Sequence, residues 1–150
     1  MQKGYKKYQV PEVPENIVSE PAAIYLTTPK IRAKEVQVKD FTYTNFKKIA
    51  DISPFTLHEW ANLLFISERT LQRYAKDNST FNGLQIERIL HLKKLVEAGN
   101  ELFGQEGFKQ WLSQKPFSLG GVAVKDMLVT HDGIQDVIDL MGRMQYGIPA

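Results

Sequence analysis

The sequence contains no cysteine, which excludes both a disulfide framework and a thiolate metal site. It also lacks an apolar run long enough to span a bilayer. The lysines near its N-terminus are not followed by the apolar segment of a signal peptide. These absences predict a soluble, cytoplasmic protein that does not act at a membrane.

A strong charge of one sign is also absent, since the net charge is only +2 over 150 residues. A value this small does not identify a nucleic-acid binder by itself. Its distribution is more informative, because residues 1–80 hold 12 Lys and Arg against 9 Asp and Glu, and residues 81–150 hold 7 against 8. The basic bias lies in the N-terminal half. Hydrophobic residues at 43% and charged residues at 24% favour a packed globular chain over a disordered one.

No catalytic or metal-binding constellation is evident in the sequence. His58, His91 and His131 are expected to lie far apart, and no histidine pair has metal-ligand spacing. His131 beside Asp132 at a helix start is typical of capping. Gly120-Gly121 lacks the preceding strand and following helix of a phosphate-binding loop. We therefore expect no catalytic residue, metal or cofactor, and an enzyme is the least favoured class.

Four prolines interrupt the first forty residues, at positions 11, 14, 21 and 29. They exclude a long helix, although Ile24–Leu26 and Val36–Val38 are possible short strands or docking segments. Residues 1–40 are interpreted as an irregular N-terminal arm, and a disordered leader remains the alternative.

From residue 41 onward the pattern is helical, and local signals mark where helices begin. Thr44 is predicted to cap a helix that runs to Ile52, and Ser53-Pro54 to break it. Two pairs have the spacing of a capping box, Thr56 with Glu59 and Asn82 with Gln85, and Ser67 is predicted to cap the helix that lies between them. The prediction is an all-α protein with a DNA-binding domain over residues 41–80 and a helical partner-binding domain over residues 81–150.

The second domain begins with the longest predicted helix, which Gly104 is expected to stop. Its apolar stripe consists of Ile86, Ile89, Leu90, Leu92, Val96 and Phe103. A short helix around Phe108–Leu112, a loop and another short helix ending near Leu128 are expected to follow. Thr130 then caps a last helix, whose stripe consists of Ile134, Val137, Ile138, Met141 and Met144.

The segment Leu57–Lys76 has the pattern of a helix-turn-helix. Ala61 is small enough for two short helices to cross closely, and Leu64, Ile66, Leu71 and Tyr74 would fill the wedge between them. The outer face would then carry residue types that read bases or bind phosphates. The predicted DNA-binding residues are Ser67, Glu68, Arg69, Thr70, Gln72, Arg73 and Lys76. The alternative is a helical hairpin whose polar face is simply solvated.

The turn of this motif carries Phe65 at the position that most often holds glycine. A left-handed backbone conformation is costly for a bulky side chain. Two explanations remain open: the turn differs slightly in conformation, or burial of the phenylalanine ring offsets the strain.

Three segments in order resemble the Xre–MbcA–ParS antitoxin family, over about residues 55–149. The first is ISERTLQR at Ile66–Arg73. The second is Ala98–Gly121, with Phe103-Gly104, Trp111-Leu112, Pro116 and Leu119-Gly120-Gly121 at the family's landmarks. The third is Asp126–Ala150, where Leu128, Thr130, Gly133, Val137, Leu140, Arg143, Tyr146 and Gly147 match the closing motif. The chain departs from the family in lacking a proline near Val124.

This resemblance implies the labile partner of a RES-domain toxin that attacks NAD, with the C-terminal region obstructing the toxin and the helix-turn-helix binding the operon's promoter. Met, Arg and Tyr suit such an interface. The predicted toxin-binding residues are Asp136, Leu140, Arg143, Met144, Tyr146, Gly147 and Ile148. For the two methionines of the last helix, plain core filling is the alternative. A homodimer or a larger hetero-oligomer with the toxin is expected. A stand-alone helix-turn-helix repressor is the alternative function.

Overall fold

The computed structural model describes residues 41–147; the predicted arm over residues 1–40 and the last three residues lie outside the described part. Residues 41–147 form six α-helices and no strand, which confirms the all-α prediction for this range. The helices are α2 (Tyr43–Ile52), α3 (Leu57–Leu63), α4 (Glu68–Asp77), α5 (Gly83–Trp111), α6 (Val124–Met127) and α7 (His131–Gln145), with a short 3-10 helix η2 (Phe117–Leu119) before α6. The predicted boundary near residue 80 stays a prediction.

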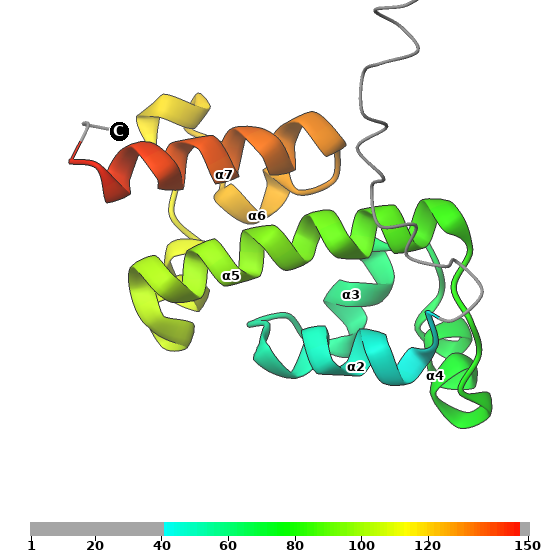
Figure 1. The fold of residues 1–150 in the computed structure, drawn as a ribbon. Coiled ribbons are helices and arrows are strands. Elements are labelled where there is room, and N and C mark those ends of the chain that lie inside the picture. Colours follow the sequence, from blue (N-terminus) through cyan, green and yellow to red (C-terminus); the bar gives the residue numbers. More distant parts are fainter. Residues whose placement is uncertain (1–40, 148–150) are drawn as a thin grey trace, which may run out of the picture. The chain divides into compact units, whose positions relative to one another are not determined.

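Helix α5 runs through the middle of this part of the chain, with α7 along one side and α2 and α3 on the other (Figure 1). The predicted stripe is buried at Ile86, Ile89, Leu92 and Val96, and half-buried at Leu90 and Phe103. Leu95 is also fully buried, because α5 has neighbours on more than one side. Burying each such side chain stabilises the folded state by about 1.5–3 kcal/mol, so α5 contributes strongly to the stability of the core.

The predicted capping signals are confirmed in four of five cases. Both capping boxes form: the Thr56 and Asn82 side chains each accept a backbone N–H three residues on, and the Glu59 and Gln85 side chains accept in return. Ser67 caps α4 and Thr130 caps α7 in the simpler one-bond form. These caps can be predicted from the sequence because both partners of each bond lie within one helical turn.

The predicted cap of the first described helix is wrong. Helix α2 begins at Tyr43, and Thr42 occupies the cap position without a side-chain bond. Thr44 lies inside the helix, where its backbone N–H and its hydroxyl both contact Oδ1 of Asn78, at 3.0 and 2.9 Å. Asn78 ends α4 in the left-handed conformation, with φ of 46°. The hydrogen bonds between Thr44 and Asn78 therefore link α2 to the end of α4.

Gly104 breaks the helical path of α5 as predicted. Its φ of 71° and ψ of 166° are not helical, and helical structure resumes beyond it to Trp111. The resumed segment folds back so that Phe108 is fully buried. A side-chain carbon added at Gly99 would overlap the Phe108 ring, so the glycine allows this close approach.

The C-terminal elements also follow the expected pattern. Helix α6 ends at Met127 with Leu128 as its C-cap. On α7, Ile134, Val137 and Met141 are buried, whereas Ile138 and Met144 are half-buried. Among the helices of residues 41–147, none combines the length and the apolar composition needed to cross a membrane.

Candidate nucleic-acid and partner-binding surfaces

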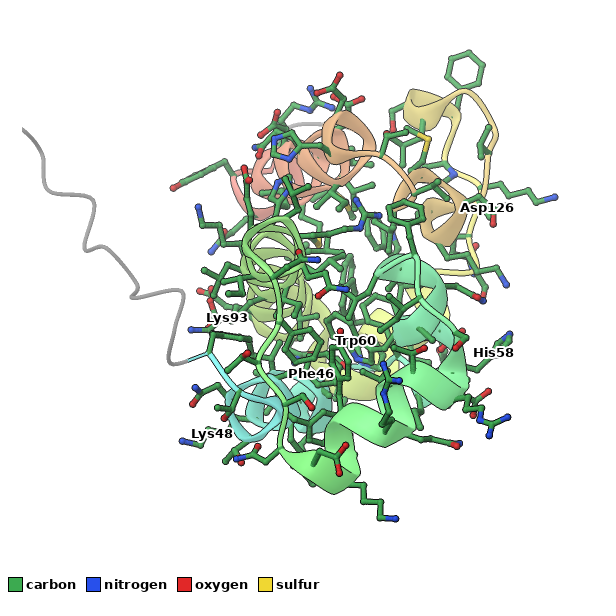
Figure 2. All side chains as sticks on the ribbon, turned by 90° about the vertical axis from the view of Figure 1, so that its right-hand side faces the viewer. Phe46, Lys48, His58, Trp60, Lys93 and Asp126 are labelled. Carbon is green, nitrogen blue, oxygen red and sulfur yellow. The ribbon has the colours of Figure 1, made fainter. Side chains whose placement is uncertain are left out.

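Helices α3 and α4 form a hairpin whose inner residues are those that the sequence pattern indicated. Ala61, Leu64 and Leu71 are buried, and Ile66 and Tyr74 pack against them. The hairpin is anchored to the core by Trp60, which meets Phe46 of α2 edge-on at 5.1 Å between ring centroids (Figure 2). The Trp60 indole N–H donates to the Ser53 hydroxyl at 2.9 Å. The position of α4 is therefore fixed by the core.

The turn between α3 and α4 adopts the left-handed conformation at Phe65, with φ of 57°. The backbone N–H of Ile66 donates to the Ala61 carbonyl at 3.0 Å, which closes the turn. The Phe65 ring is 68% exposed, so the explanation that burial of the ring offsets the strain is wrong. Instead, the guanidinium carbon of Arg88 lies 4.7 Å from the centroid of the ring.

Arg88 of α5 connects this turn to the other half of the chain. Its Nε donates to the carbonyl of Leu63, the last residue of α3. One terminal nitrogen donates to the Leu128 and Val129 carbonyls at 2.7 and 2.8 Å, beyond the end of α6. Carbonyls at helix C-termini have no hydrogen-bond donor within the helix and carry partial negative charge. Arg88 therefore supplies charged donors to the C-terminal ends of both α3 and α6. Burial lowers the pKa of Arg88 below its ordinary value. Sequence reasoning missed this residue.

The outward face of α4 presents cations together, with Arg69, Arg73 and Lys76 all exposed. Gln72 is exposed on the same helix. Of the seven predicted DNA-binding residues, three are already engaged within the protein. The Ser67 hydroxyl caps α4 and contacts the Thr70 hydroxyl at 2.8 Å, and Thr70 is half-buried. Glu68 pairs with His58 at 3.3 Å. The three exposed cations of α4 are therefore the part of the set best placed to meet a ligand.

A second surface gathers the residues predicted to bind a toxin. Asp136, Arg143, Tyr146 and Gly147 are exposed along α7 and at its end, and Met144 is half-buried. Leu140 is fully buried, so it belongs to the core of this chain and is withdrawn from the partner-binding set. Ile148 lies outside the described residues.

Beside these residues, the loop between α5 and α6 and the side of α7 enclose a surface hollow of about 390 Å³. It is lined by Ser118, Leu119, Met127, Asp136, Asp139 and Arg143. The same loop carries Phe117, which is 96% exposed. Phe117 is not among the residues predicted from the sequence to bind a partner. An aromatic residue between a proline and two glycines was the available signal for an exposed loop.

Two of the histidines expected to lie far apart are neighbours. The rings of His91 on α5 and His131 on α7 lie 4.2 Å apart, centroid to centroid. Nε2 of His91 is 3.2 Å from the Gln135 side-chain oxygen, while its buried Nδ1 contacts no polar atom of the described residues. Burial lowers the pKa of His91, and the hydrogen bond with Gln135 opposes that effect. The ring therefore favours its neutral form in the folded protein.

No protein-family model matches the chain. Two curated proteins, both named antitoxin Xre, are similar to it. That of Yersinia enterocolitica is 28% identical over 103 residues, which covers 62% of this chain and 70% of the relative. That of Photorhabdus laumondii is likewise 28% identical over 103 residues, covering 67% of this chain and 70% of the relative.

Proposed function

We propose that this chain, a distant homologue of the Xre antitoxins, is itself an antitoxin that binds promoter DNA through α4 and a cognate toxin through its C-terminal helices. The observation that carries the proposal is the exposed cationic face of α4 in a helix-turn-helix of a chain with this homology. The resemblance of the motifs to the RES-associated family makes an NAD-consuming RES-domain enzyme the expected toxin. In this role the chain is an inhibitor and regulator with no catalytic function of its own.

The DNA-binding half rests on position and charge. In a helix-turn-helix, the start of the second helix enters the major groove. Arg69 and Arg73 lie on the first two turns of α4, and arginine pairs well with guanine edges or with phosphates. Lys76 follows in the last turn and suits a phosphate contact. Helix-turn-helix proteins commonly bind paired half-sites as dimers, so we expect a dimer on the operator.

The toxin-binding half rests on the exposed residues at the end of α7. Tyr146 is 83% exposed, and Arg143 is exposed one turn before it. Buried aromatic and arginine side chains tend to dominate binding energy at interfaces. The exposed carboxylates of Asp136 and Asp139 would steer a partner whose cleft is basic, as a cleft for an NAD pyrophosphate would be.

The test uses the product of the neighbouring gene, which the proposal expects to be a RES-domain toxin, co-expressed with either the full chain or a chain truncated after Met141. Truncation removes Arg143 and Tyr146 but retains the buried residues Ile134, Val137 and Met141. We expect the truncated chain to lose neutralisation, measured as cell growth and NAD level, while it still shifts a promoter fragment. Thermal unfolding of the truncated chain controls for loss of fold.

The possible outcomes separate the alternatives. If the truncated chain neutralises the toxin fully, the end of α7 and the tail are not the inhibitory element. If no neighbouring RES-domain protein binds the full chain while promoter binding persists, a stand-alone repressor is the better description.

A further inference from the structure

The loop between α5 and α6 exposes one aromatic side chain almost completely. Phe117 begins η2 and is 96% exposed, whereas Leu119, two residues later, packs against the core. Nothing in the fold of residues 41–147 requires an aromatic residue here, because the ring buries almost no area against them. An exposed phenylalanine beside a hollow is the kind of feature that marks interaction sites.

The loop is held in shape by its own backbone. At its tip, the N–H groups of Leu119 and Gly121 both donate to the Pro116 carbonyl, at 3.1 and 3.2 Å. Gly120 and Gly121 have φ of 72° and 73°, which permit this tight path. Further bonds close the base, from Val124 N–H to the Gln114 carbonyl at 3.0 Å and from Lys125 N–H to the Leu112 carbonyl at 2.9 Å. A side chain presented by an ordered loop loses less conformational entropy on binding.

The surroundings of the loop indicate what it meets. Ser118 and Leu119 line the hollow together with Asp136, Asp139 and Arg143 of α7. Asp139 accepts a bond from the Gln135 amide at 2.9 Å, and no ion pair links Arg143 to either aspartate within residues 41–147. The two aspartates leave this rim net acidic. An acidic rim disfavours DNA phosphates and favours a protein surface with basic side chains.

We propose that Phe117 is an anchor of the toxin interface: its ring enters an apolar pocket of the toxin, and a basic side chain beside that pocket lies over Asp136 and Asp139. This inference rests on the proposed function and extends its surface from the end of α7 to the loop of residues 116–121. A second copy of the chain fits less well, because a two-fold contact brings the same patch of each copy together and would oppose like charges.

The experiment compares Phe117→Ser with Leu84→Ser in the full chain, each titrated against the RES-domain toxin that the proposed function expects the neighbouring gene to encode. Leu84 is a matched control, since it is 80% exposed at the start of α5. Loss of a central aromatic anchor should weaken binding by about 30-fold or more, mainly through faster dissociation. The control should bind as the parent does. Both variants should keep the parent's thermal unfolding and promoter binding.

Two further variants separate the parts of the proposal. Gly120→Ala disfavours the backbone conformation at φ of 72° while keeping the ring, so it should weaken toxin binding by loosening the loop. The double variant of Asp136→Asn with Asp139→Asn should slow association and reduce its salt dependence, with little effect on dissociation. The double variant of Glu87→Gln with Glu106→Gln, at two exposed sites on α5, controls for the loss of two carboxylates.

The outcomes distinguish this inference from the function on which it rests. A full chain that binds no toxin contradicts the proposed function. A full chain that binds, with Phe117→Ser binding equally well, overturns only the role of Phe117. If Phe117→Ser leaves toxin affinity unchanged but abolishes self-association in sedimentation velocity, the occupant is a second copy and the proposal is wrong.

Discussion

The guanidinium of Arg88 covers the ring of Phe65, the one residue of the α3–α4 turn with a left-handed backbone, at 4.7 Å from the ring centroid. The left-handed conformation costs a non-glycine residue about 1–2 kcal/mol. A cation over an aromatic face contributes about 0.5–2 kcal/mol, which is of the same size. The exposed phenylalanine thus has a structural use: it partners the cation that joins the ends of α3 and α6.

Replacing Arg88 should destabilise the whole fold. Arg88→Gln leaves the Leu63, Leu128 and Val129 carbonyls without their charged donor, and hydrogen bonds to charged groups are each worth about 1.5–3 kcal/mol. Arg88 is half-buried, so water can reach part of these carbonyls and the loss should be smaller than the sum over three bonds. We expect the free energy of unfolding in urea to fall by about 2–3 kcal/mol, with Arg88→Lys recovering only part because lysine lacks the planar fork. Lys93→Gln, from an exposed pair with Glu97 at 3.6 Å, should change stability by under about 0.5 kcal/mol. Equal effects at both sites would contradict the role of Arg88.

The two contributions at Phe65 can be separated by two substitutions. Phe65→Ala keeps the backbone cost and removes the ring, so it should destabilise the protein. Phe65→Gly removes both, so it should be the more stable of the two by about 1 kcal/mol. Urea denaturation of the two variants and the parent measures the difference. An alanine variant at least as stable as the glycine variant would mean that the φ of 57° carries no cost.

The sequence predicted what is decided locally and missed what distant residues decide. The capping boxes at Thr56 and Asn82 need partners only three positions away. Arg88 is different, because its acceptors lie 25, 40 and 41 positions away and nothing in the sequence near it indicates them. The contact between His91 and His131 likewise exists only once α5 and α7 pack together.

The other discrepancies have different causes. Leu140 follows Val137 by three positions, so helical periodicity alone places it on the buried face of α7, whereas the motif match suggested the partner surface. Thr44 has the side chain of a cap residue, but the isolated pairing of Thr42 with Thr80 precedes α2 and starts the helix earlier. For Phe117, the sequence indicated a loop, but only the structure shows that no neighbour within residues 41–147 covers the ring.

Gly133 should tolerate no side chain. It lies in the first turn of α7, where an added Cβ would overlap the Met127 carbonyl and come within 2.9 Å of the Thr130 hydroxyl. Gly133→Ala should therefore lower the free energy of unfolding by about 1–3 kcal/mol. Gly142→Ala, on the same helix with open space around it, should instead raise stability by about 0.5–1 kcal/mol. Thermal or urea unfolding of both variants checks the opposite signs.

His91 should make the protein less stable in acid. Burial lowers its pKa in the folded state below the usual 6.5, so on acidification the unfolded chain takes up the proton first. The free energy of unfolding should fall as the pH drops below about 7, until the folded-state pKa is passed. Protonation would also place a charge beside His131 and near Arg88 and Lys94, while the Gln135 side chain partly compensates.

The variant that checks this is His91→Gln, which should reduce the slope of stability against pH between about pH 7 and 5. His58→Gln, at an exposed position, controls for the loss of one histidine. Urea titrations at several pH values give the two slopes. A slope that is unchanged in His91→Gln would show that other groups account for the acid sensitivity.

The exposed cations of α4 should account for most of the electrostatic part of promoter binding. Removing one cation that binds a phosphate should flatten the dependence of log affinity on log salt by about 0.9, so replacing Arg69, Arg73 and Lys76 together by alanine should flatten it by up to about 2.7. A cation that binds a base edge instead of a phosphate would, when replaced, weaken binding to the operator more than to unrelated DNA. The matched control replaces Lys94, Lys109 and Lys115, three exposed lysines outside α4, and so removes the same charge. Fluorescence anisotropy on the promoter fragment over a range of salt concentrations measures both slopes. If the two triple variants flatten the slope equally, overall charge explains the binding and α4 is not the DNA-reading helix.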